Sequence, residues 1–133
     1  MLRVLIVLFG VLAPSSAFLT HFHFNGTLHC PHAKFYRELG VWEWDVWSGN
    51  AIGYIPSSPS HAPHRYEVLA SDTGDYDWFW QNYEIWFKIK HDCNDDGIPR
   101  VLWVDVGTFP ETNGHLYHSK DIDLYNKGER ITQ

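Results

Sequence analysis

The sequence predicts an all-β protein, an antiparallel β-sandwich of six to eight short strands. The first observation is period-two alternation, clearest over residues 83–90, where apolar and polar side chains alternate as in a strand with one buried face. The second is the even spacing of turns rich in Gly, Pro, Asn and Asp. No segment has the period and length of an amphipathic helix, so a sandwich is favoured. The side chains expected to face the core in that strand are Tyr83, Ile85, Phe87 and Ile89.

The first 17 residues are predicted to be a secretory signal peptide. Arg3 supplies the positive charge, residues 4–12 form a short apolar run, and Ala17 is a small residue at the expected cleavage position. The run is shorter than the roughly 20 residues that a membrane-spanning helix needs. The alternative is a buried N-terminal strand. We expect a secreted, extracellular protein with one β-sandwich domain over residues 18–133 and no transmembrane segment.

The chain is acidic and aromatic. It carries 10 Lys and Arg residues against 16 Asp and Glu residues, a formal net charge of -6. Such a charge is unsuited to nucleic acid, whose phosphates need a basic surface. The 17% aromatic content lets a small domain form a dense core. We therefore expect neither a nucleic-acid partner nor a cofactor.

The remaining strands are assigned in chain order from the same alternation. Gly26 in the first strand would permit a β-bulge. Residues 55–63 are rich in Pro and Ser and are expected to form a loop, and residues 71–74 a turn. Ile122 and Leu124 are expected to face the core in the last strand. The expected strands are residues 22–30, 35–46, 66–70, 83–90, 101–106 and 119–125.

Cys30 and Cys93 are the two cysteines of the chain. In an oxidising compartment we expect them to form a disulfide, which would close a loop of about 60 residues and stabilise the fold by roughly 4 kcal/mol. Buried free thiols and pairing with another chain are the alternatives. Asn25 begins the triplet Asn-Gly-Thr, so it is a candidate glycosylation site, although the triplet could lie inside a strand.

Four segments share a pattern with one protein family. Residues 25–30, NGTLHC, match a G-x-L-x-C strand, and residues 41–45 resemble a V-x-L-W-E-x-D strand. Residues 91–100, HDCNDDGIPR, are similar to H-x-C-x-D-x-G-x-P, and residues 121–130 resemble a closing D-L-x-x-x-x-x-G-E-R stretch. Together they resemble the transthyretin-like family, the secreted proteins expanded in nematodes.

The resemblance implies a transthyretin (prealbumin)-like β-sandwich and extracellular residence. It also implies a binding or bridging role, because members are regarded as binding proteins. The chain departs from the pattern in the middle, where the usual D-x-x-G-x-F loop is hard to place, and it has no cysteine near the C-terminus. Hydroxyisourate hydrolases of this fold end in a Y-R-G-S-type signature, which is missing here, so their activity is not implied.

One metal hypothesis concerns calcium. Asp92, Asn94 and Asp96 precede Gly97 as in the first half of an EF-hand loop. The twelfth position, where a bidentate Glu is needed, is Trp103. The alternative is a turn whose Asp and Asn side chains cap the backbone, and this is preferred.

A second metal hypothesis concerns zinc, because nine histidines are many for this length. His21 and His23 would lie on one face of a strand, and His29, Cys30 and His32 follow closely. Zinc needs three or four convergent N or S ligands. No C-x-x-C or H-E-x-x-H spacing occurs, and Cys30 is assigned to the disulfide. Exposed histidines at a strand edge are the preferred interpretation, so no metal is expected.

A catalytic pair of carboxylates is also considered. Glu43 and Asp45 share a predicted strand face, and paired carboxylates perform glycoside hydrolysis. Hydrogen bonds to a neighbouring loop are the simpler interpretation, and no G-x-S-x-G motif is present. An enzyme is therefore not expected.

The run of Trp78, Phe79 and Trp80 is the predicted binding surface, since exposed aromatic residues among polar ones favour partner contacts. The alternative is that these rings cover one end of the core. The leading function is extracellular recognition or bridging of a protein or cell-surface partner. Carriage of a small apolar ligand is second, and hydrolysis is last.

Overall fold

The computed structural model describes residues 18–45, 48–74 and 82–132, so the predicted signal peptide lies outside the described residues. The described residues form strands and no helix, and an all-β fold is confirmed. None of them belongs to a helix that could cross a membrane. The strands are β1 (Phe18–His29), β2 (Lys34–Trp44), β3 (Gly49–His61), β4 (Arg65–Gly74), β5 (Asn82–His91), β6 (Arg100–Pro110), β7 (Gly114–Ser119), β8 (Ile122–Asp123) and β9 (Glu129–Arg130).

The strands join in one mixed sheet with the order β7-β1-β4-β3-β2-β5-β6-β9, and β8 pairs with β1 beside this path. β1 runs parallel to β7 and β8, and the other pairs are antiparallel. The prediction of six to eight antiparallel strands is therefore wrong, because the described residues contain nine strands and two parallel pairs. Residues 111–113 carry the chain from β6 to the start of β1, where Gly114 lies opposite Thr20. β7 consequently runs in the same direction as β1.

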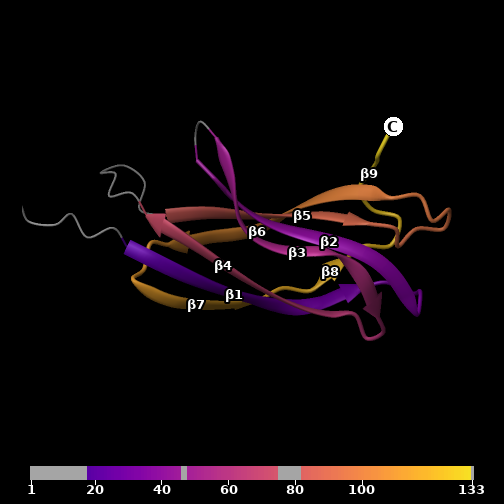
Figure 1. The fold of residues 1–133 in the computed structure, drawn as a ribbon, viewed down its shortest axis with the longest axis horizontal. Coiled ribbons are helices and arrows are strands. Elements are labelled where there is room, and N and C mark those ends of the chain that lie inside the picture. The colour runs from indigo at the N-terminus through magenta and orange to yellow at the C-terminus, as the bar shows by residue number, and fades with distance from the viewer. Residues whose placement is uncertain (1–17, 46–47, 75–81, 133) are drawn as a thin grey trace, which may run out of the picture.

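Aromatic rings from distant parts of the sheet order meet in the core. Phe22 of β1 lies edge-on to Tyr83 of β5, with centroids 5.2 Å apart, and Phe24 lies edge-on to Phe87 at 5.3 Å. Tyr66 of β4 also contacts Phe87, at 5.9 Å. Because β1 and β4 are not neighbours of β5 in the sheet, the sheet must curve until these strands face each other. Figure 1 shows β1, β4 and β7 below β2, β5 and β6.

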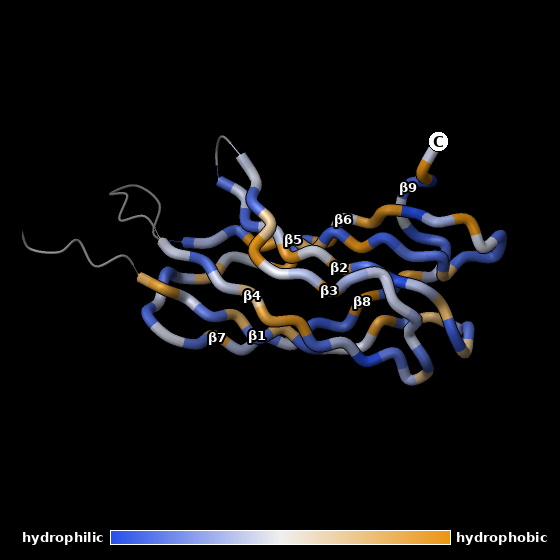
Figure 2. Tube along the Cα trace, in the orientation of Figure 1, coloured by the Kyte–Doolittle hydropathy of each residue, from blue (hydrophilic) through white to orange (hydrophobic). Residues whose placement is uncertain are grey.

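The predicted alternation of β5 is confirmed. Its core-facing side chains are at most 3% exposed, while Glu84 and Lys88 point outward. Figure 2 shows hydrophobic and hydrophilic residues interspersed along the strands rather than collected in one segment. The fully buried side chains include Phe22, Phe24, Leu28, Leu39, Val41, Ile85, Phe87, Ile89 and Leu124.

Residues 55–63 do not form the predicted loop, because β3 extends through them to His61. β3 pairs with β2 along its length, whereas its pairing with β4 is the single bridge Gly53–Ala70. Pro56 and Pro59 lack an N–H, and proline is tolerated where one edge of a strand is largely unpaired. The predicted turn at residues 71–74 is likewise wrong, since β4 continues to Gly74.

Gly26 allows a close approach of backbone rather than the predicted bulge. The register of β1 with β4 is unbroken there, with Gly26 opposite Tyr66. A Cβ on Gly26 would lie 2.0 Å from the carbonyl oxygen of Lys120. The Lys120 N–H in turn donates to the Asn25 carbonyl at 2.8 Å. Glycine is therefore needed where the parallel partner of β1 changes from β7 to β8.

The two core residues predicted near the C-terminus are buried, but the elements around them differ from the prediction. Ile122 and Leu124 are 5% and 0% exposed, which confirms their inward orientation. The strand predicted over residues 119–125 is replaced by β7, which begins five residues earlier at Gly114, and by the short β8.

Cys30 and Cys93 form the predicted disulfide, with their Cα atoms 6.1 Å apart across a sequence separation of 63. Cys30 follows β1 and Cys93 follows β5, so the bond links two strands that face each other across the core. A disulfide is consistent with an extracellular protein.

We expect Phe24→Ala to lower the free energy of unfolding by about 3–5 kcal/mol, because the ring is 1% exposed and packs against three other core rings. Urea unfolding measures this change. The control is Leu69→Ala on the outer face of β4, where the side chain is 59% exposed; its effect should stay within about 0.5 kcal/mol. Equal losses in the two variants would contradict the assignment of inner and outer faces.

Candidate functional site

Four tryptophans from three strands gather on the outer face of β2, β5 and β6. Alternation along β2 directs Leu39 and Val41 into the core and the neighbouring tryptophans outward. The register then sets Trp42 opposite Trp86 of β5, and Lys88 of β5 opposite Trp103 of β6. We call this surface the tryptophan face; it consists of Trp42, Trp44, Trp86 and Trp103.

The indole rings of the tryptophan face form an angled corner. Trp42 and Trp44 lie nearly parallel, with an interplanar angle of 25° and centroids 6.3 Å apart. Trp103 stands at 66° and 63° to them, at 5.7 and 5.9 Å. Trp44 and Trp103 remain 38% and 40% exposed. Aromatic surface in two orientations is therefore open to a ligand.

Two glycines make room for these rings. A Cβ on Gly40 would lie 2.9 Å from Nε1 of Trp42, and a Cβ on Gly49 would lie 2.9 Å from ring carbons of Trp44. A Cβ atom essentially never lies this close to a heavy atom to which it is not bonded, so a larger residue at either position would displace the indole above it. The orientation of the tryptophan face depends on these two positions.

The tryptophan face borders a hollow of about 540 Å³ that is open to solvent. Of the residues that the structure describes, its lining consists of three of the tryptophans together with Asp45 and Glu84, and none of these is Lys or Arg. The Glu84 carboxylate accepts a hydrogen bond from Nε1 of Trp86 at 3.2 Å. Asp45 accepts from the Ser48 N–H at 2.7 Å, which is the loop contact expected as the alternative to catalysis. The hollow thus combines indole faces with negative charge.

A cation of the protein already lies against the tryptophan face. The Lys88 ammonium is 5.5 Å from the centroid of Trp103 and 5.9 Å from that of Trp42. A cation within about 6 Å of an indole centroid is attracted by the negative face of the ring. The geometry of these rings therefore suits an ammonium or guanidinium group.

Negative charge accumulates at the same end of the molecule. Burial raises the pKa of Glu43 to about 7, and the carboxylates of Asp72, Asp45 and Glu111 add to the shift, as does that of Glu84. Nearby like charges disfavour the ionised form of a carboxyl group and raise its pKa in this way. The potential beside the hollow consequently favours a positively charged ligand.

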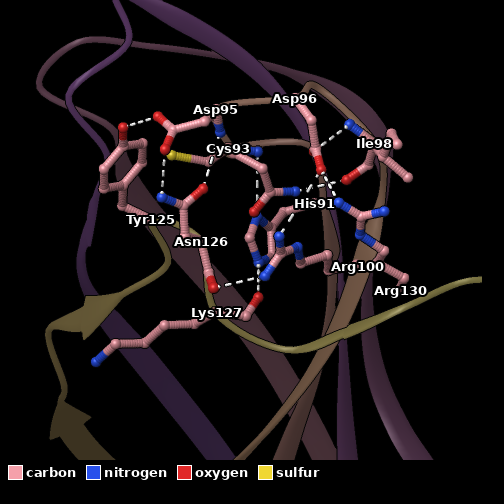
Figure 3. Close-up of polar contacts among 11 residues, drawn as sticks. His91, Cys93, Asp95, Asp96, Ile98, Arg100, Tyr125, Asn126, Lys127 and Arg130 are labelled. Carbon is pink, nitrogen blue, oxygen red and sulfur yellow. Dashed lines mark hydrogen bonds and ion pairs between the residues drawn. The ribbon is translucent and has the colours of Figure 1, made fainter.

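The turn after β5 contacts the C-terminal segment (Figure 3). The Asp95 carboxylate accepts hydrogen bonds from the Tyr125 hydroxyl and, at 2.9 Å, from Nδ2 of Asn126. Asp96 accepts from the Ile98 N–H at 2.9 Å and forms ion pairs with Arg100 and Arg130. The carboxylates of Asp95 and Asp96 are therefore engaged within the protein.

The other two residues of the calcium hypothesis also contact backbone. Asp92 accepts a hydrogen bond from the Tyr36 N–H at 2.8 Å. Nδ2 of Asn94 donates to the Ile98 carbonyl at 2.6 Å, while its Oδ1 is buried without a partner among the described residues. These contacts favour the backbone-capping interpretation of Asp92, Asn94 and Asp96.

We expect calcium to leave the melting temperature unchanged, because binding at Asp96 would have to break its ion pairs with Arg100 and Arg130. Thermal melts in calcium and in a chelator measure this, since a ligand stabilises the state that it binds. An upward shift in calcium that Asp96→Asn abolishes would show that the site exists.

His91 is buried at the base of the same turn. Its Nδ1 accepts a hydrogen bond from the Cys93 N–H at 3.1 Å, and its Nε2 contacts the Lys127 carbonyl at 2.9 Å, so Nε2 carries the proton of a neutral ring. Burial is the main cause that lowers the pKa of His91, against the opposing effects of the Lys127 carbonyl and Asp92. Protonation of Nδ1 would also break the bond from Cys93.

This lowered pKa predicts a loss of stability in acid. As pH falls below the unfolded-state pKa of 6.5, the unfolded chain takes up a proton before the folded chain does, so the free energy of unfolding decreases. Above pH 6.5 both the folded and the unfolded chain keep His91 neutral, so its contribution to the free energy of unfolding no longer changes with pH. Urea unfolding of His91→Gln should show a lower stability near pH 7.5 but a flatter decline between about pH 7 and 5. His29→Gln, at an exposed position, should keep the wild-type decline; the same decline in His91→Gln would contradict the assignment.

The histidines of the zinc hypothesis separate into two places. His32 has a ligand atom within 4.8 Å of the sulfurs of Cys30 and Cys93, but both sulfurs are in the disulfide and are not thiolates. His21 and His23 instead lie on the outer face of β1 beside β7. The residues of the zinc hypothesis therefore do not come together around one point.

The candidate glycosylation site lies within a strand. Asn25 is exposed on β1, between Glu67 of β4 and Ser119 of β7, and its Oδ1 accepts from the Ser119 hydroxyl at 2.6 Å. Glycosylation of Asn25 stays a prediction.

The binding surface predicted at Trp78, Phe79 and Trp80 lies outside the described residues. The tryptophan face was missed, although Trp42 and Trp44 alternate outward and Trp86 stands among the polar positions of β5. The missing information was the register that aligns these strands. No protein-family model matches the chain, and no curated protein matches it. The evidence for a site is therefore its geometry.

Proposed function

We propose that this chain is a secreted extracellular binding protein that recognises a protein partner through the tryptophan face, with a basic side chain of the partner entering the hollow. The observation that carries the proposal is the open hollow of about 540 Å³, lined by indole rings and by the carboxylates of Asp45 and Glu84. Binding sites of comparable volume combine apolar walls with a few polar groups in this way.

The extracellular assignment is supported by the signal-peptide pattern of residues 1–17 and by the disulfide. We further propose a transthyretin-like β-sandwich. The ring contacts of β1 and β4 with β5 support two facing layers. Two segments that carry the family resemblance, residues 91–100 and 121–130, also contact each other through Asp95 and Asn126.

A basic side chain is the occupant that fits the charge and the rings best. Arginine and lysine stack on indole faces, and Lys88 shows that this surface holds an ammonium. Trp and Arg are also the residues most enriched at the energetic centres of protein interfaces. Carriage of a small apolar ligand needs an enclosed apolar cavity, whereas this hollow is open and bordered by carboxylates, so recognition is preferred.

The test uses a short arginine peptide, acetyl-Gly-Ser-Arg-Ser-Gly-amide, titrated into the protein. Because a single side chain binds weakly, we expect a Kd of roughly 1 mM. Indole N–H resonances of Trp44, Trp86 and Trp103 should shift in two-dimensional NMR spectra, and the same peptide with Gln in place of Arg should leave them unchanged. Trp103→Ser should weaken binding at least tenfold.

The matched control is Tyr117→Ser, which removes an aromatic ring that is 74% exposed on β7. It should bind the arginine peptide like the wild-type protein. Equal shifts with the arginine and glutamine peptides, or the same loss in both variants, would reject a cation site at the tryptophan face.

A further inference from the structure

The outer face of β7, β1 and β4 carries a cluster of imidazole rings. In the parallel register of β1 and β7, His21 lies opposite His115, and His23 lies opposite Tyr117. The His115 ring is 4.8 Å from that of His21 and 5.1 Å from that of His23, measured between centroids. Side chains distant in the sequence are thus brought to one exposed surface.

Two nitrogens of this cluster lie in direct contact. Nε2 of His23 is 2.8 Å from Nδ1 of His115, so one ring donates a hydrogen bond and the other accepts it. His115 is exposed and His23 is half-buried, so both rings can be reached from solvent. Two imidazoles from different strands therefore already direct one ring nitrogen each toward the other.

The separation of these nitrogens matches a particular coordination geometry. Imidazole nitrogens bind first-row divalent ions at about 2.0 Å. Two ligands at a right angle around such an ion are then ~2.8 Å apart, whereas two ligands of a tetrahedral ion are ~3.3 Å apart. Square-planar or tetragonal coordination is typical of Cu²⁺ and Ni²⁺.

We propose that His23 and His115 form a surface site for a divalent transition-metal ion of tetragonal preference, Cu²⁺ or Ni²⁺. The ion is coordinated by Nε2 of His23 and Nδ1 of His115, and water fills its open positions. It replaces the hydrogen bond between the rings. One of the two rings donates the hydrogen bond in the metal-free protein. When the ion binds, the proton of that ring moves to the ring nitrogen that does not bind the ion, so no net proton is released. Small rotations of the half-buried His23 ring and the exposed His115 ring suffice.

The surroundings suit this class of ion. The register neighbours across β1 and β4 are Leu69, opposite His23, and Ser71, opposite His21. The ring of Tyr117 stacks on His23 at 4.4 Å. None of these three side chains is charged, and imidazole nitrogen suits a transition-metal ion better than calcium or magnesium, which prefer oxygen ligands.

His21 is not assigned as a ligand. Its Nδ1 contacts the Ser71 hydroxyl at 2.9 Å, and its ring stacks on His115. This contact orients the His21 ring beside the pair. The proposed site therefore differs from the zinc set predicted from the sequence, because β7 supplies His115 and residues 29–32 take no part. It is also independent of the proposed partner-binding function.

Cu²⁺ alone is the probe, titrated into the protein near pH 7.5 and followed by calorimetry and by electron paramagnetic resonance. We expect one site, with nitrogen hyperfine coupling from two imidazoles. His23→Gln and His115→Gln should each weaken binding at least tenfold, or about 1.4 kcal/mol, and leave coupling to one nitrogen. Melting of metal-free His115→Gln should match wild type, because exposed substitutions usually have small effects, and melting of metal-free His23→Gln shows separately whether that half-buried position also affects stability.

The matched control is His29→Gln, an exposed histidine on the same strand, which should bind Cu²⁺ like wild type. His21→Gln should lose much less affinity than His115→Gln. Unchanged affinity in His115→Gln would show that copper binds the β1 histidines without β7 and would overturn the proposal. A loss in His21→Gln as large as that in His115→Gln would overturn the two-ligand assignment.

Discussion

The disulfide between Cys30 and Cys93 fixes the relation between β1 and β5, which are not neighbours in the sheet order. Cys30 follows β1 and Cys93 follows β5, and these strands contact each other through rings rather than through backbone hydrogen bonds. In the entropic model, closing a loop of about 60 residues stabilises the folded state by roughly 4 kcal/mol. The carbonyl of buried Cys93 also accepts a hydrogen bond from the Asn126 N–H, and His91 binds the Lys127 carbonyl. The C-terminal segment is therefore held in place by the same turn that carries the disulfide.

Local alternation was sufficient to predict which side chains of β5 face the core, because one buried face imposes a period of two on any strand. The pairing partners were beyond local information. The Pro-rich β3 was predicted as a loop because proline disfavours strands, but Pro56 and Pro59 are tolerated where one edge of β3 is largely unpaired. The parallel pairing of β7 with β1 depends on where β6 ends in space, and Gly26 is required there by the approach of Lys120.

The candidate sites also depend on strand pairing, which local sequence does not reveal. The binding surface was predicted at Trp78 to Trp80 because this segment has the most aromatic residues in succession. A sequence shows directly which residues are adjacent in the chain, but not which strands lie side by side. The tryptophan face instead collects rings from β2, β5 and β6, and its members meet only through the register that sets Trp42 opposite Trp86. The pairing of His23 with His115 likewise requires a contact between residues 92 positions apart. In contrast, Cys30 and Cys93 were predictable because two cysteines allow one intramolecular bond.

The two proposed sites lie on outer faces that point away from each other. The inner faces of β1 and β4 pack against β5, so the tryptophan face and the imidazoles of β1 and β7 occupy opposite sides of the core. Their ligands also differ in chemistry, since indole rings beside carboxylates attract an organic cation, whereas neutral imidazoles bind a transition metal. Sites that share no side chains contribute additively to binding and stability. Geometry therefore permits a protein partner on one face and a metal ion on the other at the same time.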